Sequence, residues 1–156
     1  MSEKIRVLLS EDKVNKRIRE VAQQINKDYA GKEIHLICIL KGGAMFMCEL
    51  ARRISIPVSF DFMSVSSYGA GTTSSGVVRI LKDLDEDLKD KEVLIVEDII
   101  DSGRTLSYLL ELIQSRNPKS VRLCTLLDKP SRREKKDVHV DYVCFEIEDK
   151  FVVGYG

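Results

Sequence analysis

Residues 93–105 read VLIVEDIIDSGRT and join a hydrophobic strand to a helix through a short polar turn. The run begins with apolar, largely β-branched residues, as a strand buried on both faces of a parallel sheet does. Glu97 and Asp98 interrupt it where the strand should end, and Leu106 opens a segment whose apolar residues recur at helical spacing. Ligands of open α/β sheets bind at such strand ends, and the N–H groups of a helix start favour an anion such as phosphate. The stretch therefore predicts a sugar-phosphate site whose acids hold hydroxyls or a divalent cation.

A second turn of the same design follows a predicted strand at residues 34–40. Lys41, Gly42 and Gly43 end that strand, and residues 44–54 form a mostly apolar helix. Backbone N–H groups in such a turn can also hold an anion. A tight turn with an exposed lysine is the alternative interpretation, and this segment by itself leaves both open.

The composition is that of one domain with a full hydrophobic core. The chain has 156 residues, of which 44% are hydrophobic. Its 25 basic and 25 acidic side chains cancel, which argues against a broad nucleic-acid-binding surface. No stretch approaches the roughly 20 apolar residues of a membrane span, and no signal-peptide pattern opens the chain. We expect a single cytoplasmic domain over residues 1–156 that binds neither nucleic acid nor a membrane.

The cysteines are expected to be reduced packing residues. They lie far apart in apolar segments without a C-x-x-C pair, which disfavours both a zinc site and a disulfide framework. The four are Cys38, Cys48, Cys124 and Cys144. His35, the one ionisable residue of the strand at 34–40, is interpreted as a structural hydrogen-bonding group.

The remaining segments alternate between helix and strand. Ser10 is the expected N-cap of a helix that ends near Gly31, and a short strand or extended arm at residues 5–9 precedes it. Further strands are expected at residues 58–65, 77–81, 121–127 and 140–147. This alternation predicts an α/β fold with a mostly parallel central sheet flanked by helices.

Residues 66–76, between two predicted strands, are rich in glycine, serine and threonine. Such a segment has little to bury, and we expect it to be mobile. It is either a plain connection or a lid that excludes water from a reacting centre. Tyr68, beside flexible glycines, favours the lid.

The motif at residues 93–105 resembles the phosphoribosyl-diphosphate signature of type I phosphoribosyltransferases. Four further segments resemble, in order, those of the hypoxanthine-guanine (6-oxopurine) branch: residues 40–43 (LKGG), 67–68 (SY, opening the lid), 127–129 (LDK) and 149–155 (DKFVVGY). The resemblance covers nearly the whole chain. It implies the type I fold, with a small hood and a mobile loop. It also implies purine salvage, in which the 5-phosphoribosyl group passes from phosphoribosyl diphosphate to hypoxanthine or guanine and magnesium is required.

The resemblance gives each part of the 93–105 motif a role. Glu97 and Asp98 would hold the ribose hydroxyls and the metal ion. Asp101 would be the catalytic group that faces the purine N7, as a general base or as the partner of its proton. The 5′-phosphate would lie on the loop formed by Asp101, Ser102, Gly103, Arg104 and Thr105.

The other segments would bind the leaving group, the base and the closing lid. Lys41 and Gly42 would receive pyrophosphate, with a cis peptide bond between Leu40 and Lys41, and Ser67 with Tyr68 would close over the ligand. The residues that contact the purine would be Lys129, donating to its 6-oxygen, Phe151, stacking on it, and Val152, whose backbone reads its edge. For Phe151 and Val152 an ordinary terminal strand is the alternative.

Two expectations concern the assembly and the end of the chain. The resemblance implies a homodimer or homotetramer, the assemblies typical of the family, with the helix at residues 44–54 as a candidate interface. In the family, a short tail with an aspartate near the metal and an arginine near pyrophosphate follows the closing Gly-Tyr-Gly, whereas this sequence stops at Gly156. Either this sequence is a shortened part of the protein or omits disordered residues, or the protein lacks that tail. In the last case it would bind pyrophosphate more weakly and hold its metal with altered stoichiometry.

Three other functions compete with this one. A nucleotide-responsive, RNA-binding regulator on the same fold is disfavoured by the zero net charge. An enzyme for adenine, orotate or uracil is disfavoured by Lys129 and the Phe151-Val152 segment. A Rossmann dehydrogenase is disfavoured because no G-x-G-x-x-G follows a strand.

Overall fold

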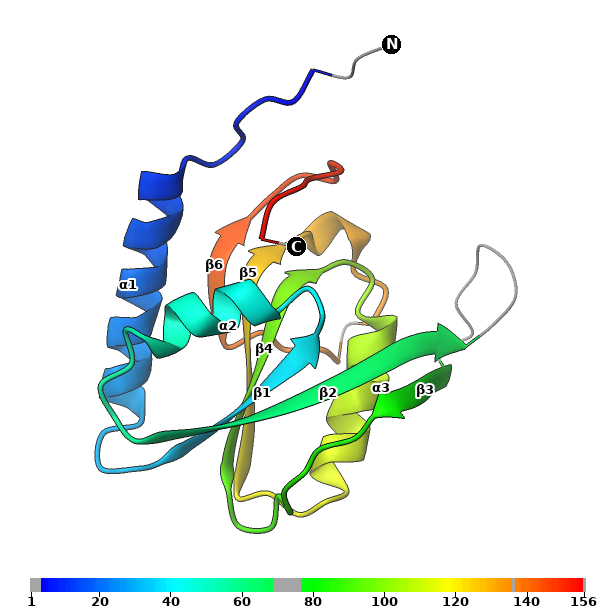
Figure 1. Ribbon diagram of the computed structural model, residues 1–156. Helices are drawn as coiled ribbons and strands as arrows, with labels where there is room; N and C mark the ends of the chain where they lie inside the picture. The colour runs from blue at the N-terminus through cyan, green and yellow to red at the C-terminus, as the bar shows by residue number, and fades with distance from the viewer. Residues whose placement is uncertain (1–3, 69–76, 136, 156) are drawn as a thin grey trace.

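In a computed structural model, which describes residues 4–68, 77–135 and 137–155, six strands form one central sheet (Figure 1). The strand order is β3-β2-β1-β4-β5-β6, and every neighbouring pair is parallel except β2 and β3. The strands are β1 (Ile34–Leu40), β2 (Val58–Tyr68), β3 (Val77–Lys82), β4 (Glu92–Ile100), β5 (Ser120–Asp128) and β6 (Tyr142–Glu146). The helices are α1 (Glu11–Asp28), α2 (Ala44–Ala51), α3 (Arg104–Gln114) and the 3-10 turn η1 (Pro130–Arg132). The predicted mostly parallel α/β sheet is confirmed.

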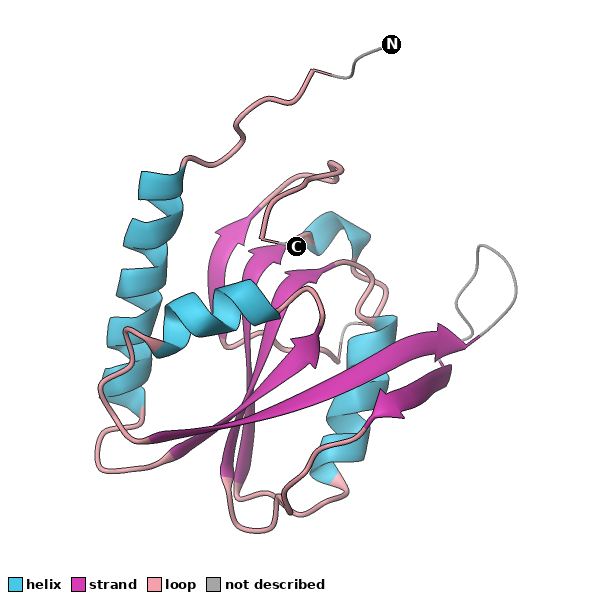
Figure 2. Ribbon diagram, in the orientation of Figure 1, coloured by secondary structure: helices cyan, strands magenta, loops and turns pink. Residues whose placement is uncertain are grey.

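The helices cover both faces of the sheet, so the central strands are buried on both sides (Figure 2). In β4, Leu94 and Val96 join the cluster beneath α1 and α2, whereas Val93 and Ile95 join the cluster beneath α3. Successive side chains of a strand point to opposite faces, which explains why the strand is an unbroken apolar run. This sandwich holds the strand ends rigidly at one edge of the sheet.

Helix α1 begins where the sequence predicts. The Ser10 hydroxyl accepts the Lys13 N–H at 3.2 Å, and the first turn carries two acids, which the helix dipole favours. Its apolar stripe is buried against the sheet: Val14, Ile18, Val21, Ala22 and Ile25. Gly31, with φ 78°, follows the helix end in the left-handed conformation that glycine tolerates.

Some sequence expectations are wrong at the surface. Of the two expectations for residues 5–9 the strand is wrong and the extended arm is confirmed, with Ile5 and Val7 exposed. Helix α2 ends at Ala51 instead of residue 54. Cys48 is exposed on that helix and is not a packing residue, and Met45 beside it is 61% exposed. The error arises because an apolar helix covers the sheet with only one of its faces, while a composition-based reading buries all of it.

The hairpin of β2 and β3 is longer than predicted. The register runs to the pair of Tyr68 with Val77, so the strand passes the expected end at residue 65. The predicted mobile segment at residues 66–76 is wrong for its first three residues, which belong to β2, while residues 69–76 and the side chains of Ser67 and Tyr68 lie outside the described residues. The lid therefore stays a prediction.

A buried polar cluster fixes the opposite edge of the sheet, where β1 begins. His35 Nδ1 lies 2.7 Å from the Ser59 hydroxyl, and its Nε2 lies 3.8 Å from Asp61 Oδ2. The Asp61 carboxylate accepts backbone N–H groups from Phe62, Asp85 and Glu86 at 2.8–3.2 Å. These bonds attach the connection between β3 and β4 to the sheet, and the structural interpretation of His35 is confirmed.

Candidate functional site

The predicted site residues lie at the carboxyl ends of three neighbouring strands. The turn at Lys41 follows β1, the acidic motif ends β4, and Lys129 follows β5. Because these strands are parallel and adjacent, their ends share one edge of the sheet, where Figure 1 also places the start of α2 and the segment after β6. Segments up to a hundred residues apart in sequence thus form one site.

The loop between β4 and α3 has the geometry of an anion cradle. Gly103 is the N-cap of α3 with φ 80°, and no side chain caps the helix start. The Ser102 hydroxyl accepts the Arg104 N–H at 3.3 Å, and Thr105 follows in the first turn. An uncapped helix start with hydroxyls beside it offers N–H donors to a phosphate.

The cradle is held from outside by the residues that follow β5. The Ser102 carbonyl accepts N–H groups from Glu134 at 2.9 Å and Lys135 at 3.2 Å. Arg133 donates to the Asp101 carbonyl at 3.3 Å, and the Glu134 carboxylate pairs with Arg104. A Cβ on Gly103 would lie 3.2 Å from Arg133 Cδ, so the arginine would have to shift by a few tenths of an ångström, and the φ of 80° itself favours glycine.

Arg133 and Asp128 are contacts that the sequence reasoning missed. Arg133 lies in a charged segment of the kind that usually forms a solvated loop, yet its side chain is only 15% exposed and pairs with the buried Asp128 carboxylate. Burial raises the pKa of Asp128, and the Arg133 guanidinium opposes that rise. The only sequence signal for this pair is the spacing of an acid at a strand end and an arginine five residues later.

The turn after β1 lies against the acids of β4. The peptide bond between Leu40 and Lys41 is cis, as predicted. A Cβ on Gly42 would lie 2.8 Å from Asp98 Cγ and closer still to one carboxylate oxygen, a separation that real Cβ atoms do not show. The Asp98 carboxylate also accepts the Ile99 N–H at 2.8 Å. The backbone of the proposed pyrophosphate turn therefore touches the proposed metal-binding acid.

The donor set at the end of β4 fits a divalent cation. Burial, and next the adjoining Asp98 carboxylate, raise the pKa of Glu97 well above its ordinary value, and a bound cation would offset both effects. Within the described residues, no group of three or more His, Cys, Asp or Glu side chains forms a closed metal cage. Magnesium needs none, because it keeps several waters and takes one or two carboxylates together with substrate phosphates.

Lys129, which follows β5, lies beside Asp101, the predicted catalytic residue. Its Nζ lies 3.4 Å from Asp101 Oδ1, and its backbone N–H donates to the Ile100 carbonyl at 3.0 Å. Phe151 is 94% exposed and packs against nothing, while Val152 lines a pocket of about 70 Å³ beside Asp98. Residues 147–155 contain no strand, so the alternative of an ordinary terminal strand is wrong.

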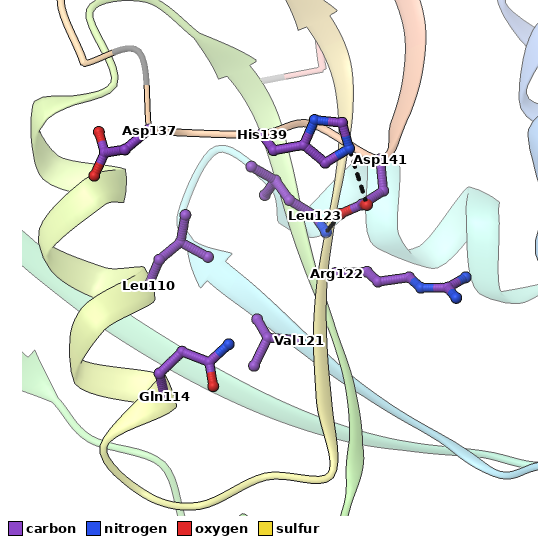
Figure 3. Close-up of a pocket in the computed structure, with 8 residues that line it drawn as sticks. All are labelled: Leu110, Gln114, Val121, Arg122, Leu123, Asp137, His139 and Asp141. Atoms are coloured by element: carbon purple, nitrogen blue, oxygen red, sulfur yellow. Dashed lines mark hydrogen bonds and ion pairs between the residues drawn. The ribbon is translucent and has the colours of Figure 1, made fainter.

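A larger pocket lies elsewhere and contains none of the predicted site residues. It measures about 250 Å³ and lies between α3 and β5 (Figure 3). It is lined by Leu110, Gln114, Val121, Arg122, Leu123, Asp137, His139 and Asp141. The sticks in Figure 3 show Arg122 directed away from the hollow. The size of a pocket therefore does not locate the site here.

Comparison with known proteins gives matches over nearly the whole chain. The phosphoribosyl transferase domain model matches residues 7–156. The chain is 51% identical to the hypoxanthine phosphoribosyltransferase of Salmonella typhimurium over 158 residues, covering all of this chain and 88% of that protein. It is 51% identical to the hypoxanthine-guanine phosphoribosyltransferase of Mycobacterium tuberculosis (strain H37Rv), covering 96% and 77%. A crystal structure of the hypoxanthine phosphoribosyltransferase from Staphylococcus aureus superposes with a TM-score of 0.94 at 49% identity, covering 97% and 82%.

The match spans every segment that forms the site, and the solved relative has the same fold. The chain therefore belongs to the phosphoribosyl transferase family, among the hypoxanthine-guanine phosphoribosyltransferases.

Proposed function

We propose that this protein transfers the 5-phosphoribosyl group of phosphoribosyl diphosphate to hypoxanthine or guanine, giving IMP or GMP and pyrophosphate in purine salvage. One observation carries the proposal: the anion cradle after β4 adjoins the pair of Lys129 with Asp101, at 3.4 Å. A cradle alone would suit any phosphate. The pair beside it suits a base that offers a carbonyl oxygen to a cation and a ring nitrogen to a carboxylate.

The cradle would bind the 5′-phosphate of the sugar. The first N–H groups of α3 and the hydroxyls of Ser102 and Thr105 supply donors, and the positive helix end favours the charge. Arg104, paired with Glu134, lies in the first turn of the helix. Gly103 keeps the backbone close enough for these donors to converge.

Glu97 and Asp98 would hold the ribose hydroxyls and a magnesium ion. When bound, magnesium would neutralise charge on the departing pyrophosphate. The Gly42 backbone touches Asp98, so the N–H groups of the turn at Lys41 and Gly42 would meet the pyrophosphate beside the same carboxylates. Binding of the leaving group and of the metal would therefore be coupled.

Asp101 would face the purine N7 and take or stabilise its proton as the new bond forms at N9. The positive charge that develops on the ribose during such a reaction also favours carboxylates nearby. Lys129 would donate to the 6-oxygen, Phe151 would stack on the base, and the Val152 backbone would read its edge. An ammonium group has no acceptor for a 6-amino group, which explains a preference for 6-oxopurines.

A turnover assay with a panel of bases tests the proposal. With phosphoribosyl diphosphate and magnesium, hypoxanthine and guanine should give IMP and GMP, while adenine, orotate and uracil should give little product. Omitting magnesium should abolish turnover. Failure of both oxopurines under saturating conditions would contradict the proposed function, and salt-dependent RNA binding without turnover would favour the regulator instead.

Several further expectations accompany this proposal. Ser67 and Tyr68 would close over the bound substrates, and the protein would assemble as a homodimer or homotetramer. No helix among the described residues is long and apolar enough to cross a membrane.

A further inference from the structure

The Lys129 ammonium lies between two carboxylates, of which the proposed function uses only one. Asp101 Oδ1 is 3.4 Å from Lys129 Nζ, and Asp149 Oδ1 is 3.7 Å away on the segment after β6. The lysine side chain is only 9% exposed. Its charged end is therefore placed largely by these two acids, and Asp149 has no role in the reaction proposed above.

Asp149 is itself fixed from a second direction. Arg132 Nη1, on the turn η1, lies 3.4 Å from Asp149 Oδ2. The four side chains Asp101, Lys129, Asp149 and Arg132 thus form a chain of alternating charges with a net charge of zero. Such a balanced arrangement can adjoin an uncharged base without leaving an uncompensated charge next to it.

We propose that Asp149 is a positioning and specificity-determining residue that orients the Lys129 ammonium toward the 6-oxygen of the base. This inference rests on the proposed function. An ammonium group has three donors and no acceptor. Asp101 and Asp149 lie at ion-pair distances of 3.4 Å and 3.7 Å, so their charges hold the ammonium in place while its donors remain available to the base.

Removing the Asp149 charge changes both partners of the catalytic pair. Lys129 then keeps a single carboxylate, that of Asp101, and its ammonium shifts toward that acid. The lysine no longer presents a donor at the 6-oxygen, and Asp101 is more strongly engaged by a cation while it should face N7. Both changes weaken binding of hypoxanthine and reduce the discrimination against 6-amino bases.

Asp149→Asn tests the inference, with Glu148→Gln as the matched control. Glu148 is the neighbouring acid, is exposed and pairs with Lys150 instead of Lys129. We expect Asp149→Asn to lower kcat/KM for hypoxanthine about five- to tenfold, mainly through KM, and to narrow the preference for hypoxanthine over adenine. Glu148→Gln should have the same kcat/KM and base preference as the parent. Arg132→Gln should lower kcat/KM for hypoxanthine less than Asp149→Asn does.

A double variant separates an effect through Lys129 from a general disturbance of the segment. In a Lys129→Gln background, the additional Asp149→Asn change should cost less than twofold. IMP binding, measured by calorimetry on the same proteins, gives a readout that does not depend on turnover. A parent-like Asp149→Asn protein, or an undiminished loss in the Lys129→Gln background, would overturn the inference while leaving the enzyme's activity standing. A parent that neither turns over nor binds IMP would instead refute the proposed function.

Discussion

At the scale of single residues, the site places one carboxylate, that of Asp101, between the proposed phosphate cradle and Lys129, the lysine proposed to face the base. We expect Asp101→Asn to reduce kcat by about a hundred- to ten-thousand-fold, the range that general acid–base groups contribute. Steady-state turnover of hypoxanthine would measure it, with the melting temperature as the check on folding. Asp12→Asn, on the exposed first turn of α1, is the matched control and should leave kcat unchanged.

The prediction for Gly42 concerns steric overlap rather than charge. A methyl group there would overlap the Asp98 carboxylate, so Gly42→Ala must move either the turn or the acid. We expect KM for phosphoribosyl diphosphate to rise at least tenfold, together with the magnesium concentration needed for half-maximal rate.

Gly31→Ala is the contrasting variant for this experiment. Gly31 has a positive φ but nothing within 4 Å of an added Cβ, and it lies before β1, whereas Lys41 and Gly42 follow the opposite end of that strand. It should lower the free energy of unfolding by about 1 kcal/mol with unchanged kinetics. Equal kinetic effects of the two substitutions would show that contact with Asp98 is not what makes Gly42 necessary.

At the scale of elements, the edge where β1 begins should make stability depend on pH. Burial, and next the nearby Lys91 charge, lower the pKa of His35 below 6.5. The unfolded chain therefore binds a proton more readily than the folded protein, and stability falls as pH drops through the unfolded value toward the folded one. In urea titrations between pH 8 and pH 5, His35→Gln should flatten this part of the profile. If the slope of stability against pH is unchanged in this variant, groups other than His35 cause the pH dependence.

Asp61 acts on the same edge at lower pH. Burial opposes its ionisation, but backbone N–H groups of Asp85, Glu86 and Phe62 outweigh that cost and lower the pKa of Asp61. Its contribution is present above the unfolded pKa of about 3.9 and is lost as pH falls through the lower folded value. We expect Asp61→Asn to cost about 1–3 kcal/mol of unfolding free energy at pH 7, because the charged acceptor is lost. Asp87→Asn, on the same connection but exposed, should cost far less.

The elements also show what a sequence can and cannot predict. The buried strands are readable because β1 and β4 are apolar on both faces, and α1 is readable from Ser10 and its stripe. Which side chains of β2 are buried cannot be predicted in the same way, because Asp61 and Met63 are buried while Phe60 is 47% exposed. Asp61 is buried only because backbone N–H groups from another connection reach it, and such long-range partners leave no local pattern.

The same limit applies to the site. The acids, the cradle and Lys129 are predictable because each ends a recognisable strand. The role of Arg133 is not predictable, because Arg132 and Lys135 near it in sequence are charged and exposed, as residues of a surface loop commonly are. Its role depends on the Asp128 side chain and the Asp101 carbonyl meeting it across the strand ends.

At the scale of the whole molecule, bound nucleotide should stabilise the fold by mass action. A ligand at a hundred times its Kd adds about 2.7 kcal/mol. For a domain of this size, that corresponds to a rise in melting temperature of roughly 5–10 °C. We expect IMP and GMP to give this shift and AMP at the same concentration to give little, in a thermal melt of the parent protein. Equal shifts with all three nucleotides would indicate that the phosphate cradle alone binds, without reading the base.

The sheet itself sets the distance between the proposed sites for the two substrates. Ile100 pairs with Asp128, so the residues that follow them, Asp101 and Lys129, begin one strand spacing apart, about 4.8 Å. The distance between the proposed phosphate cradle and the proposed base-binding lysine is thus set by the spacing of two buried strands. A flexible loop could not hold that distance constant. A designer could therefore exchange Lys129 after β5 and residues 149–152, the proposed base-binding residues, for another specificity without moving the proposed sugar-phosphate site.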